Sequence, residues 1–219
     1  MPSESAERIL EAATRLFGER GYPSTSMRDI GEAVGLLAGS LYSHISSKEA
    51  VLFQIVETGL DRYLGALLPI VESDEPADVR LRAAVKAHVE LVATHIEESL
   101  VALHQWKFLS GENRGRIEAK RHAGSDAYHR ILAQGIDSGV FKPVPNPDIT
   151  ISGILGMLNW VPEWYSPKGP ATPEQIGDQL ADLLLGGLLA SPAAAAAPKG
   201  RAQRTGGTTP NPRTNTHSR

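Results

Sequence analysis

The stretch between residues 26 and 48 limits the possible folds of this 219-residue chain more than any other part of it. Ser26 can cap the start of a short helix, and Asp29 can complete a capping box with it. Gly35 then permits the left-handed backbone with which many helices end. Apolar spacing predicts a second short helix from about Ala38 to His44. Two short helices joined at a glycine predict a helix-turn-helix, whose second helix can enter a DNA major groove.

The same pattern also fits a helical hairpin inside an all-α domain, and charge gives DNA binding little general support. The formal net charge of the chain is −3, and its first 57 residues hold five Arg or Lys against eight Asp or Glu. DNA binding would therefore depend on a local cluster of cations and on helix N-termini directed at phosphates.

Three segments of the N-terminal part are distinctive, and they read AERILEAATRLFGERGYPSTS, TSMRDIGEAVGL and GSLYSHISSKEAVL. Over about the first 55 residues they resemble the DNA-binding domain of the TetR family of bacterial transcriptional regulators. The resemblance implies a homodimer that represses transcription from operator DNA. It also implies release from that DNA when a small molecule binds the C-terminal domain.

Family members contact DNA from the recognition helix and from the starts of the helices on either side of it. Carried onto this sequence, the resemblance implies DNA contacts by Ser26, Arg28, Ala38, Gly39, Ser40, Tyr42, His44 and Lys48. Tyr42 and Lys48 are expected at phosphates. Arg28, Ser40 and His44 could reach base edges or phosphates, and Gly39 would allow close approach. The ring of Tyr42 could instead pack partly on the first helix.

Apolar residues recur at helical spacing along the rest of the chain and predict an all-α fold of about nine helices without strands. Ser46 and Glu49 suggest a capping box that opens a long helix ending near Pro69. The polar segment SGENRGRIEAKRHAG is expected to lead into a second long helix. Two further helix starts are predicted at Asn146 and at Thr172.

These elements divide the chain into three predicted parts. Residues 1–48 would form the helix-turn-helix domain, and residues 49–190 a domain for ligand binding and dimerisation. Residues 191–219 combine an alanine run with Pro, Gly, Thr and five Arg or Lys without an acid, so this tail is expected to be disordered. We favour a dispensable terminus over a basic arm that adds salt-dependent phosphate contacts.

Aromatic residues form only 5% of the chain but gather in the predicted second domain, notably in WVPEWYSPKGP at residues 160–170. Core packing explains such clusters more often than ligand binding does. However, a ring-lined cavity between helices is a usual form of small-molecule site. We therefore predict a hydrophobic effector site that includes His88, His104, Trp106, Tyr128, Trp160, Trp164 and Tyr165.

Residues 160–170 and the LLLGGL ending also resemble TetR regulators of steroid and fatty-acyl catabolism in actinobacteria, which bind acyl-CoA thioesters. This resemblance implies a CoA thioester as the effector. Relatives place a basic side chain near the tryptophan for the CoA phosphates, whereas Gly156 stands one turn before Trp160 here. The basic residues that could replace it are Lys107, Arg114, Arg116, Lys120 and Arg121.

The sequence predicts neither a metal site nor a cofactor. The chain has no cysteine, and His88 and His95 would lie about 10 Å apart along a helix, too far to share an ion. We expect no enzymatic activity, because no Gly-rich phosphate loop, G-x-S-x-G or H-E-x-x-H motif is present. Without a signal peptide or a membrane-length apolar run, the chain is expected in the cytoplasm.

The two last predicted helices are apolar and rich in small residues, so we expect them to form the dimer interface. The dimer would bind a palindromic operator with half-sites about 34–36 Å apart. The competing hypothesis is a helical small-molecule-binding protein that does not bind DNA.

Overall fold

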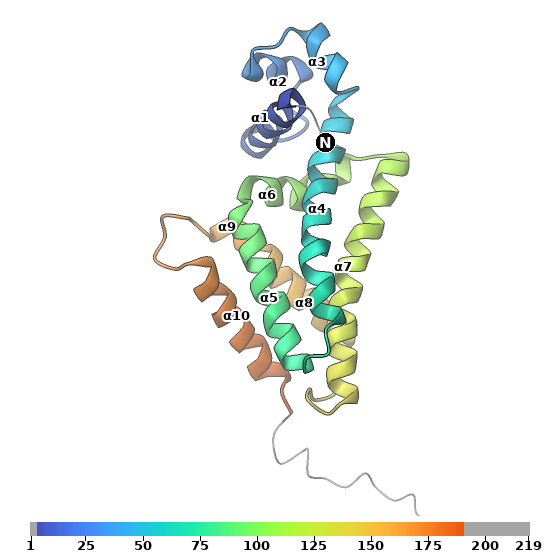
Figure 1. Ribbon diagram of the computed structural model, residues 1–219, viewed down its shortest axis with the longest axis vertical. Coiled ribbons are helices and arrows are strands. Elements are labelled where there is room, and N and C mark those ends of the chain that lie inside the picture. Colours follow the sequence, from blue (N-terminus) through green and yellow to red (C-terminus); the bar gives the residue numbers. More distant parts are fainter. Residues whose placement is uncertain (1–3, 191–219) are drawn as a thin grey trace, which may run out of the picture.

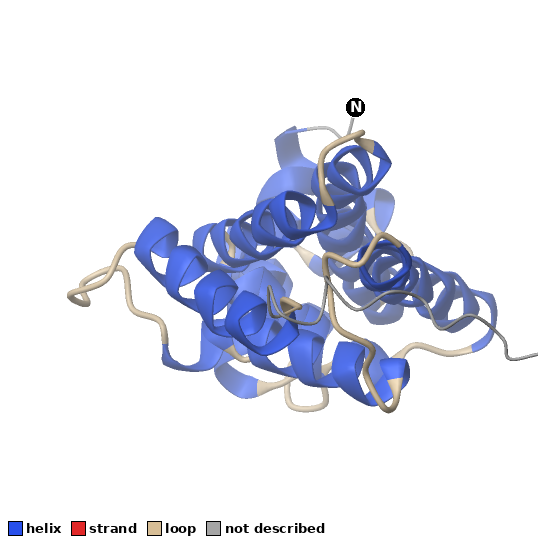
Figure 2. Cartoon of the chain, turned by 90° about the horizontal axis from the view of Figure 1, so that it is seen from below, coloured by secondary structure: helices blue, strands red, loops and turns tan. Residues whose placement is uncertain are grey.

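This computed structural model describes residues 4–190 of the chain (Figure 1). Within that range there are ten α-helices and one short 3-10 helix. In chain order they are α1 (Glu4–Arg20), α2 (Met27–Val34), α3 (Ala38–His44), α4 (Lys48–Glu72), α5 (Ala77–Thr94), α6 (Ile96–His104), η1 (Trp106–Phe108), α7 (Gly111–Asp137), α8 (Pro147–Asn159), α9 (Val161–Trp164) and α10 (Pro173–Leu188). Figure 2 shows helices and loops only, and the one β-bridge between described residues joins Phe141 to Leu189. The all-α prediction is confirmed. The predicted basic tail, residues 191–219, lies outside the described residues.

The first three helices form one end of the molecule, and α4 runs from them into the body (Figure 1). Their shared core contains Phe17 of α1, Ile30 of α2, Leu41 of α3 and Leu52 of α4, all fully buried. The same cluster extends to Val101, Leu109 and Ile117, which belong to α6, the following loop and α7. The N-terminal helices are therefore packed directly onto elements of the second domain.

A second core surrounds α5, which packs against α4, α7 and α10. Gly177 lets α10 approach α5 closely, because a Cβ at this position would lie only 3.2 Å from the Cα of Lys86. Lys86 also pairs with Asp178 at 2.9 Å, one residue further along α10. Small-residue packing and this ion pair fix α10 against α5.

Three predicted helix starts are confirmed by their caps. The Oγ of Ser26 accepts a hydrogen bond from the N–H of Asp29 at 3.2 Å, and Asp29 accepts one from the N–H of Ser26 at 2.7 Å. Asn146 caps α8, and Thr172 forms a capping box with Gln175 at the start of α10. Such caps depend on residues three positions apart, so the sequence shows them directly.

The predicted capping box at Ser46 and Glu49 is wrong by one residue. Ser47 caps α4 by accepting from the N–H of Ala50 at 3.0 Å, and Glu49 instead accepts from the N–H and hydroxyl of Ser110. The predicted end of this helix near Pro69 is also too early, since α4 continues to Glu72. In the last turn a proline removes only one hydrogen bond, and burial of the surrounding apolar residues compensates for it.

Other helix boundaries differ because tertiary contacts override the local pattern. The polar segment that was expected to precede the long helix is itself the first half of α7, where Ile117 is buried and Arg114 pairs with Glu118. The helix predicted to start at Asn146 ends at Trp160, and a separate short helix, α9, follows it. This break produces ten helices where the sequence predicted about nine.

Candidate DNA-binding and effector-binding sites

The exposed surface of α2 and α3 carries most of the predicted DNA-binding side chains. Ser40 and His44 are exposed on α3, and the side chain of Tyr42 is 53% exposed. Ser26 and Arg28 are exposed at the start of α2, where Ser26 is the N-cap. For Ala38 and Gly39 the structure describes the backbone of α3 but not the side-chain surroundings.

The two predicted cations in this region already have partners within the chain. The Nε of Arg28 donates to Glu32 at 2.8 Å across one turn of α2. The ammonium of Lys48 donates to the carbonyl oxygens of Tyr22 at 2.9 Å and Thr25 at 2.8 Å, and it lies 4.2 Å from the centre of the Tyr22 ring. Two of its three donors are therefore used to fix the turn between α1 and α2. A phosphate contact by Lys48 stays a prediction.

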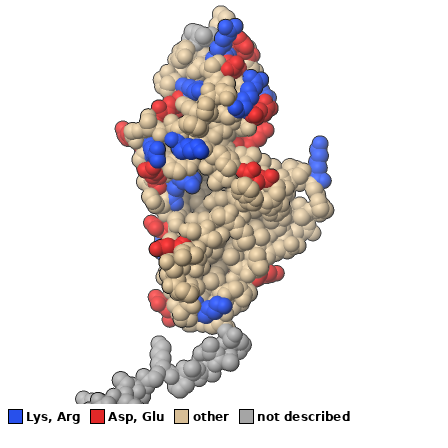
Figure 3. Space-filling model, turned by 180° about the vertical axis from the view of Figure 1, so that it is seen from behind, with Lys and Arg blue, Asp and Glu red and all other residues tan. Residues whose placement is uncertain are grey.

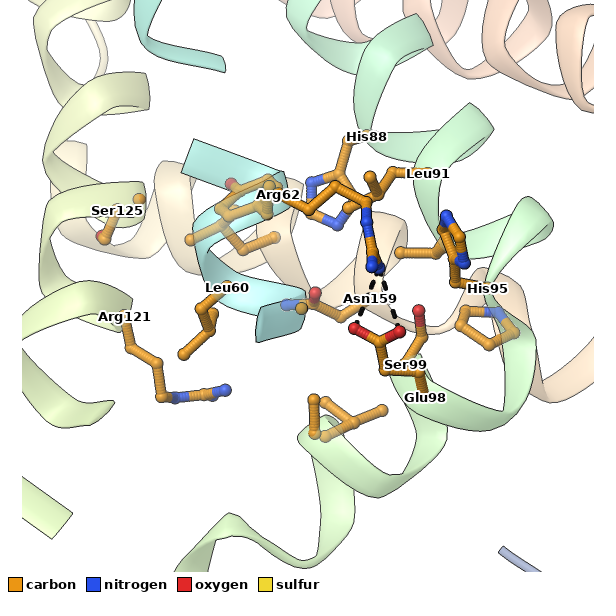
Figure 4. A pocket seen from close by; sticks show the side chains of 18 residues that line it. Leu60, Arg62, His88, Leu91, His95, Glu98, Ser99, Arg121, Ser125 and Asn159 are labelled. Carbon is orange, nitrogen blue, oxygen red and sulfur yellow. Dashed lines mark hydrogen bonds and ion pairs between the residues drawn. The ribbon is translucent and has the colours of Figure 1, made fainter. Parts of the chain in front are cut away.

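A cavity of about 130 Å³ lies between α4, α5, α6, α7, α8 and the start of α9 (Figure 4). Its lining consists of Gly59, Leu60, Arg62, Tyr63, His88, Leu91, Val92, His95, Glu98, Ser99, Ala102, Leu103, Arg121, Gly124, Ser125, Leu155, Asn159 and Pro162. Gly124 makes room for the Tyr63 ring, because a Cβ there would lie 2.7 Å from a carbon of that ring. The helices α4 to α9 thus all contribute side chains to one pocket, which is partly open to solvent.

The inner wall of this cavity is polar but uncharged. Burial lowers the pKa of His88 to about 4, so its imidazole is neutral at neutral pH. Its Nδ1 lies 3.4 Å from the hydroxyl of Tyr128, which donates to the carbonyl oxygen of Ala84 at 3.2 Å. Burial also raises the pKa of the Tyr128 hydroxyl above its ordinary value. This wall offers hydrogen bonds without adding a net charge.

Three charged side chains line the same cavity. Arg62 of α4 donates twice through Nη1 to the carboxylate of Glu98 on α6, at 3.0 and 2.9 Å (Figure 4). Arg121 of α7 places its guanidinium carbon 4.8 Å from the centre of the Trp106 ring. Burial lowers the pKa of Arg121 from its ordinary value. The lining therefore combines one neutralised ion pair with one further cation.

The wall of the cavity is connected to the N-terminal helices through Gln105, the residue that follows α6. Its Nε2 donates to the carbonyl oxygen of Phe17 at 2.6 Å, and its Oε1 accepts a hydrogen bond from the N–H of Tyr22. Both partners lie at the C-terminal end of α1 or just after it. A displacement of α6 would therefore act on the support of the helix-turn-helix.

Comparison with known proteins assigns both parts of the chain to one family. Residues 9–55 match the family described as "Bacterial regulatory proteins, tetR family", and residues 74–188 match "Tetracyclin repressor-like, C-terminal domain". The chain belongs to the TetR family of bacterial transcriptional regulators. This TetR-family chain is thus a DNA-binding transcriptional regulator and not an enzyme, as the sequence predicted.

Several relatives of this TetR-family regulator have names or structures. The HTH-type transcriptional repressor KstR2 of Mycobacterium tuberculosis is 32% identical over 82% of this chain and 90% of its own length. The structure of KstR2, described as a ketosteroid transcriptional regulator, gives a TM-score of 0.81 at 29% identity and covers 87% of this chain and 98% of its own. AibR, solved with isovaleryl coenzyme A and operator DNA, gives a TM-score of 0.76 at 34% identity, covering 83% and 98%.

The structure brings only part of the predicted effector site of this regulator together. His88 lines the cavity, whereas Tyr128 is not a lining residue but contacts His88 through its hydroxyl. Trp106 does not line it, but its ring stacks on the lining residue Arg121. The lining also includes Arg62, Glu98 and Asn159, which are not part of the predicted effector site.

The remaining predicted rings lie outside the lining of the cavity. Trp160 and Trp164 are 57% and 52% exposed, because the helix break at Trp160 turns both away from the core. His104 pairs with Glu163 on the surface, and the half-buried Tyr165 packs against the second core. Their contact with an effector stays a prediction.

An uncharged face is formed by α8 and α10 of this TetR-family chain. Ile149 and Leu183 are 71% and 65% exposed there, and Figure 3 shows a broad area with few charged side chains in the lower half of the molecule. Apart from Gly177, the glycines on these helices are open to the outside, since a Cβ at Gly153, Gly156, Gly186 or Gly187 would meet no atom within 4 Å. Exposed apolar groups beside open glycines are typical of surfaces that pack against another helix.

Two further findings concern the described residues as a whole. Residues 4–190 contain no group of three or more His, Asp or Glu side chains arranged to hold a metal ion. None of the helices within that range is both long enough and apolar enough to cross a bilayer.

Proposed function

We propose that this chain is a homodimeric repressor that leaves its operator when a small molecule fills the cavity between α4 and α8. The observation that carries this proposal is the position of the cavity. Arg62 and Glu98 join α4 to α6 across its wall, and Gln105 joins α6 to the end of α1. A ligand that separates α4 from α6 would therefore change the support of the helix-turn-helix.

On the DNA side, α3 would enter the major groove, and the predicted contacts would come from Ser26, Arg28, Ala38, Gly39, Ser40, Tyr42, His44 and Lys48. Exposure of Tyr42, Ser40 and His44 is compatible with this role. The domain division at residue 48 fits the start of α4 at Lys48. The protein would work in the cytoplasm, where its DNA lies.

Dimerisation would use the uncharged face of α8 and α10. Two copies of this face, related by a twofold axis, would form a four-helix interface in which the open glycines allow close approach. The two recognition helices would then match half-sites about 34–36 Å apart in a palindrome.

The effector is proposed to be a fatty-acyl or steroid-derived CoA thioester. The presence of isovaleryl coenzyme A in the AibR structure and the ketosteroid regulation named for KstR2 support this class. A cavity of about 130 Å³ is smaller than the roughly 300–1,000 Å³ of typical ligand pockets. It would therefore enclose only the far end of the acyl group, while the rest of the effector, including the CoA portion, would lie outside it.

Release is proposed to occur by a shift between two arrangements of the dimer. The effector would favour the arrangement in which α4 holds the recognition helices out of register with the operator. The shift cannot exceed the difference between the affinities of the effector for the two arrangements.

Fluorescence anisotropy with DNA from upstream of the gene tests this proposal. We expect salt-dependent binding that prefers this DNA over a shuffled sequence of equal length and that weakens when an acyl-CoA is added. Equal binding to both sequences would contradict the repressor and favour the helical small-molecule-binding protein. Specific binding that no acyl-CoA affects would contradict the effector class.

A further inference from the structure

Arg121 differs from the other basic side chains in its half of α7. Arg114 pairs with Glu118 at 2.8 Å, and both Arg116 and Lys120 pair with Glu57 of α4, at 2.6 and 3.1 Å. For Arg121 the described residues provide no carboxylate within ion-pair distance, and its close contact is the face of Trp106. One cation of this helix segment is thus left without a counter-charge.

This unpaired cation lies in the wall of the cavity. Figure 4 shows the Arg121 side chain extending from α7 into the cavity, on the side that faces Asn159 and the Arg62–Glu98 pair. A guanidinium presents five N–H donors, and a partly buried cation without an anionic partner is costly. The ring of Trp106 offsets part of this cost, but it accepts no bidentate hydrogen bond.

The charges of the other lining residues determine which anion fits. Arg62 and Glu98 neutralise each other, and the buried His88 is neutral at neutral pH. The cavity therefore has room for one negative charge. It does not offer the several free cations that a pyrophosphate would need, because Arg114, Arg116 and Lys120 are already paired outside the lining.

The size of the cavity sets a second limit. An engineered cavity of about 150 Å³ encloses benzene, so a space of about 130 Å³ holds a group of roughly five or six non-hydrogen atoms. The apolar part of the lining, which includes Leu60, Leu91 and Leu155, suits a short hydrocarbon chain.

We infer that the enclosed part of the effector is a short chain that ends in a carboxylate, and that this carboxylate binds Arg121. The inference rests on the proposed function, because it takes this cavity as the effector site. Two molecules could supply the group: a free short-chain carboxylic acid, or a CoA thioester whose acyl group ends in a second carboxylate. Both would form a paired, charge-assisted contact with the guanidinium.

Calorimetric titration of the full chain compares probes that differ mainly in charge. For the free acid, the charged probe is butyrate and its uncharged counterpart is butyramide, each with about six non-hydrogen atoms. For the thioester, the charged probe is succinyl-CoA, whose acyl group ends in a carboxylate, and the comparison is butyryl-CoA, whose acyl group ends in a methyl group. We expect the carboxylate-bearing probe to bind about 10- to 100-fold more tightly in at least one pair, the usual range for hydrogen bonds to a charged group. The pair that shows this preference identifies the source.

The variant Arg121→Gln should abolish this preference, and Arg114→Gln is its matched control. Arg114 also lies over the Trp106 ring, at 5.5 Å, but does not line the cavity, so its loss should leave the preference unchanged. If Arg121→Gln does not fold, Arg121→Lys replaces it and should reduce the preference, since lysine lacks the bidentate geometry.

Equal affinities within both pairs, or a preference that the Arg121 variants do not alter, would overturn the inference. Release of DNA by butyryl-CoA and succinyl-CoA alike, together with equal binding of butyrate and butyramide, would also overturn it, but would leave the proposed function intact. Conversely, tight carboxylate binding at Arg121 without any effect on DNA binding would retain the carboxylate site but contradict the proposed function, because the bound molecule would not be an effector.

Discussion

The substitution Gly156→Ala separates the stability of the protomer from that of the dimer. Gly156 is exposed inside α8, and a Cβ added there would meet no atom of the chain within 4 Å. Alanine is favoured over glycine in a helix by about 0.5–1 kcal/mol, so the isolated protomer should become more stable by about that amount. In the dimer, the same methyl group would enter the close contact between α8 and the partner.

The cost in the dimer can be worked out from its symmetry. Adding a methyl group to a well-packed interface costs about 1–3 kcal/mol, and a twofold interface contains the change twice. The dimer should therefore lose about 2–6 kcal/mol, which raises its dissociation constant by at least about 30-fold. The helix-propensity gain cancels, because it is present in both the protomer and the dimer.

Sedimentation velocity over a concentration series measures this dissociation constant, and thermal unfolding at low concentration measures protomer stability. Gly115→Ala is the matched control, since Gly115 is also helical, exposed and open, but lies on α7 away from the proposed interface. It should raise protomer stability and leave dimerisation unchanged. If Gly156→Ala dimerises as tightly as Gly115→Ala, the α8 and α10 face is not the dimer interface.

Three further outcomes follow from single side chains. Gln105→Ala removes the hydrogen bonds of Gln105 to Phe17 and Tyr22. The free energy of unfolding, measured in urea, should fall by about 1–3 kcal/mol. An unchanged free energy would show that Gln105 does not connect α6 to the end of α1. Because burial depresses the pKa of His88 to about 4, the unfolded chain binds more protons below its ordinary pKa of 6.5, and stability should fall by about 3 kcal/mol as the pH drops from 7.5 to 4. His88→Gln should reduce this slope and the exposed-site control His122→Gln should not, whereas equal slopes would refute the assignment. Lys48→Met should destabilise the fold by about 1–3 kcal/mol, because two hydrogen bonds to carbonyl oxygens are lost. Arg28→Ala should mainly weaken DNA binding. If Lys48 or Arg28 contacts a phosphate, its removal should reduce the slope of log affinity against log salt concentration by about one.

Local chemistry made the helix starts predictable, and long-range contacts made the other boundaries unpredictable. The caps at Ser26, Asn146 and Thr172 act over three residues and were found from the sequence. The first half of α7 looks like a polar loop in isolation. It is helical because Ile117 is buried and Arg116 pairs with Glu57, 59 residues away.

The cavity shows a similar division. His88 belongs to the predicted site and does line the cavity, because it lies on the buried face of α5. Trp160 and Trp164 also belong to the predicted site, but the break at Trp160 turns both outward. Arg121 did carry a recognisable signal, since it shares the buried stripe of α7 with Gly124 and Tyr128. A charged residue at that spacing marks a polar site inside the core.

Lys48 illustrates how a correct observation can have more than one physical explanation. A cation in the first turn of a helix opposes the helix dipole, so Lys48 needs a stabilising contact elsewhere. The structure supplies one in the carbonyl oxygens of Tyr22 and Thr25. Such contacts join residues more than 20 positions apart and cannot be deduced from the spacing of residues near Lys48.

The distance between the two recognition helices of the dimer tests the account most directly. The chain has no cysteine, so Ser43→Cys on the exposed surface of α3 introduces one labelling site per protomer. Pulsed electron–electron double resonance between two spin labels at this site should give one distance distribution with operator DNA bound. It should give a clearly different distribution after addition of the acyl-CoA that best releases the DNA. An unchanged distribution on release would contradict the claim that the cavity controls DNA binding through the spacing of the recognition helices.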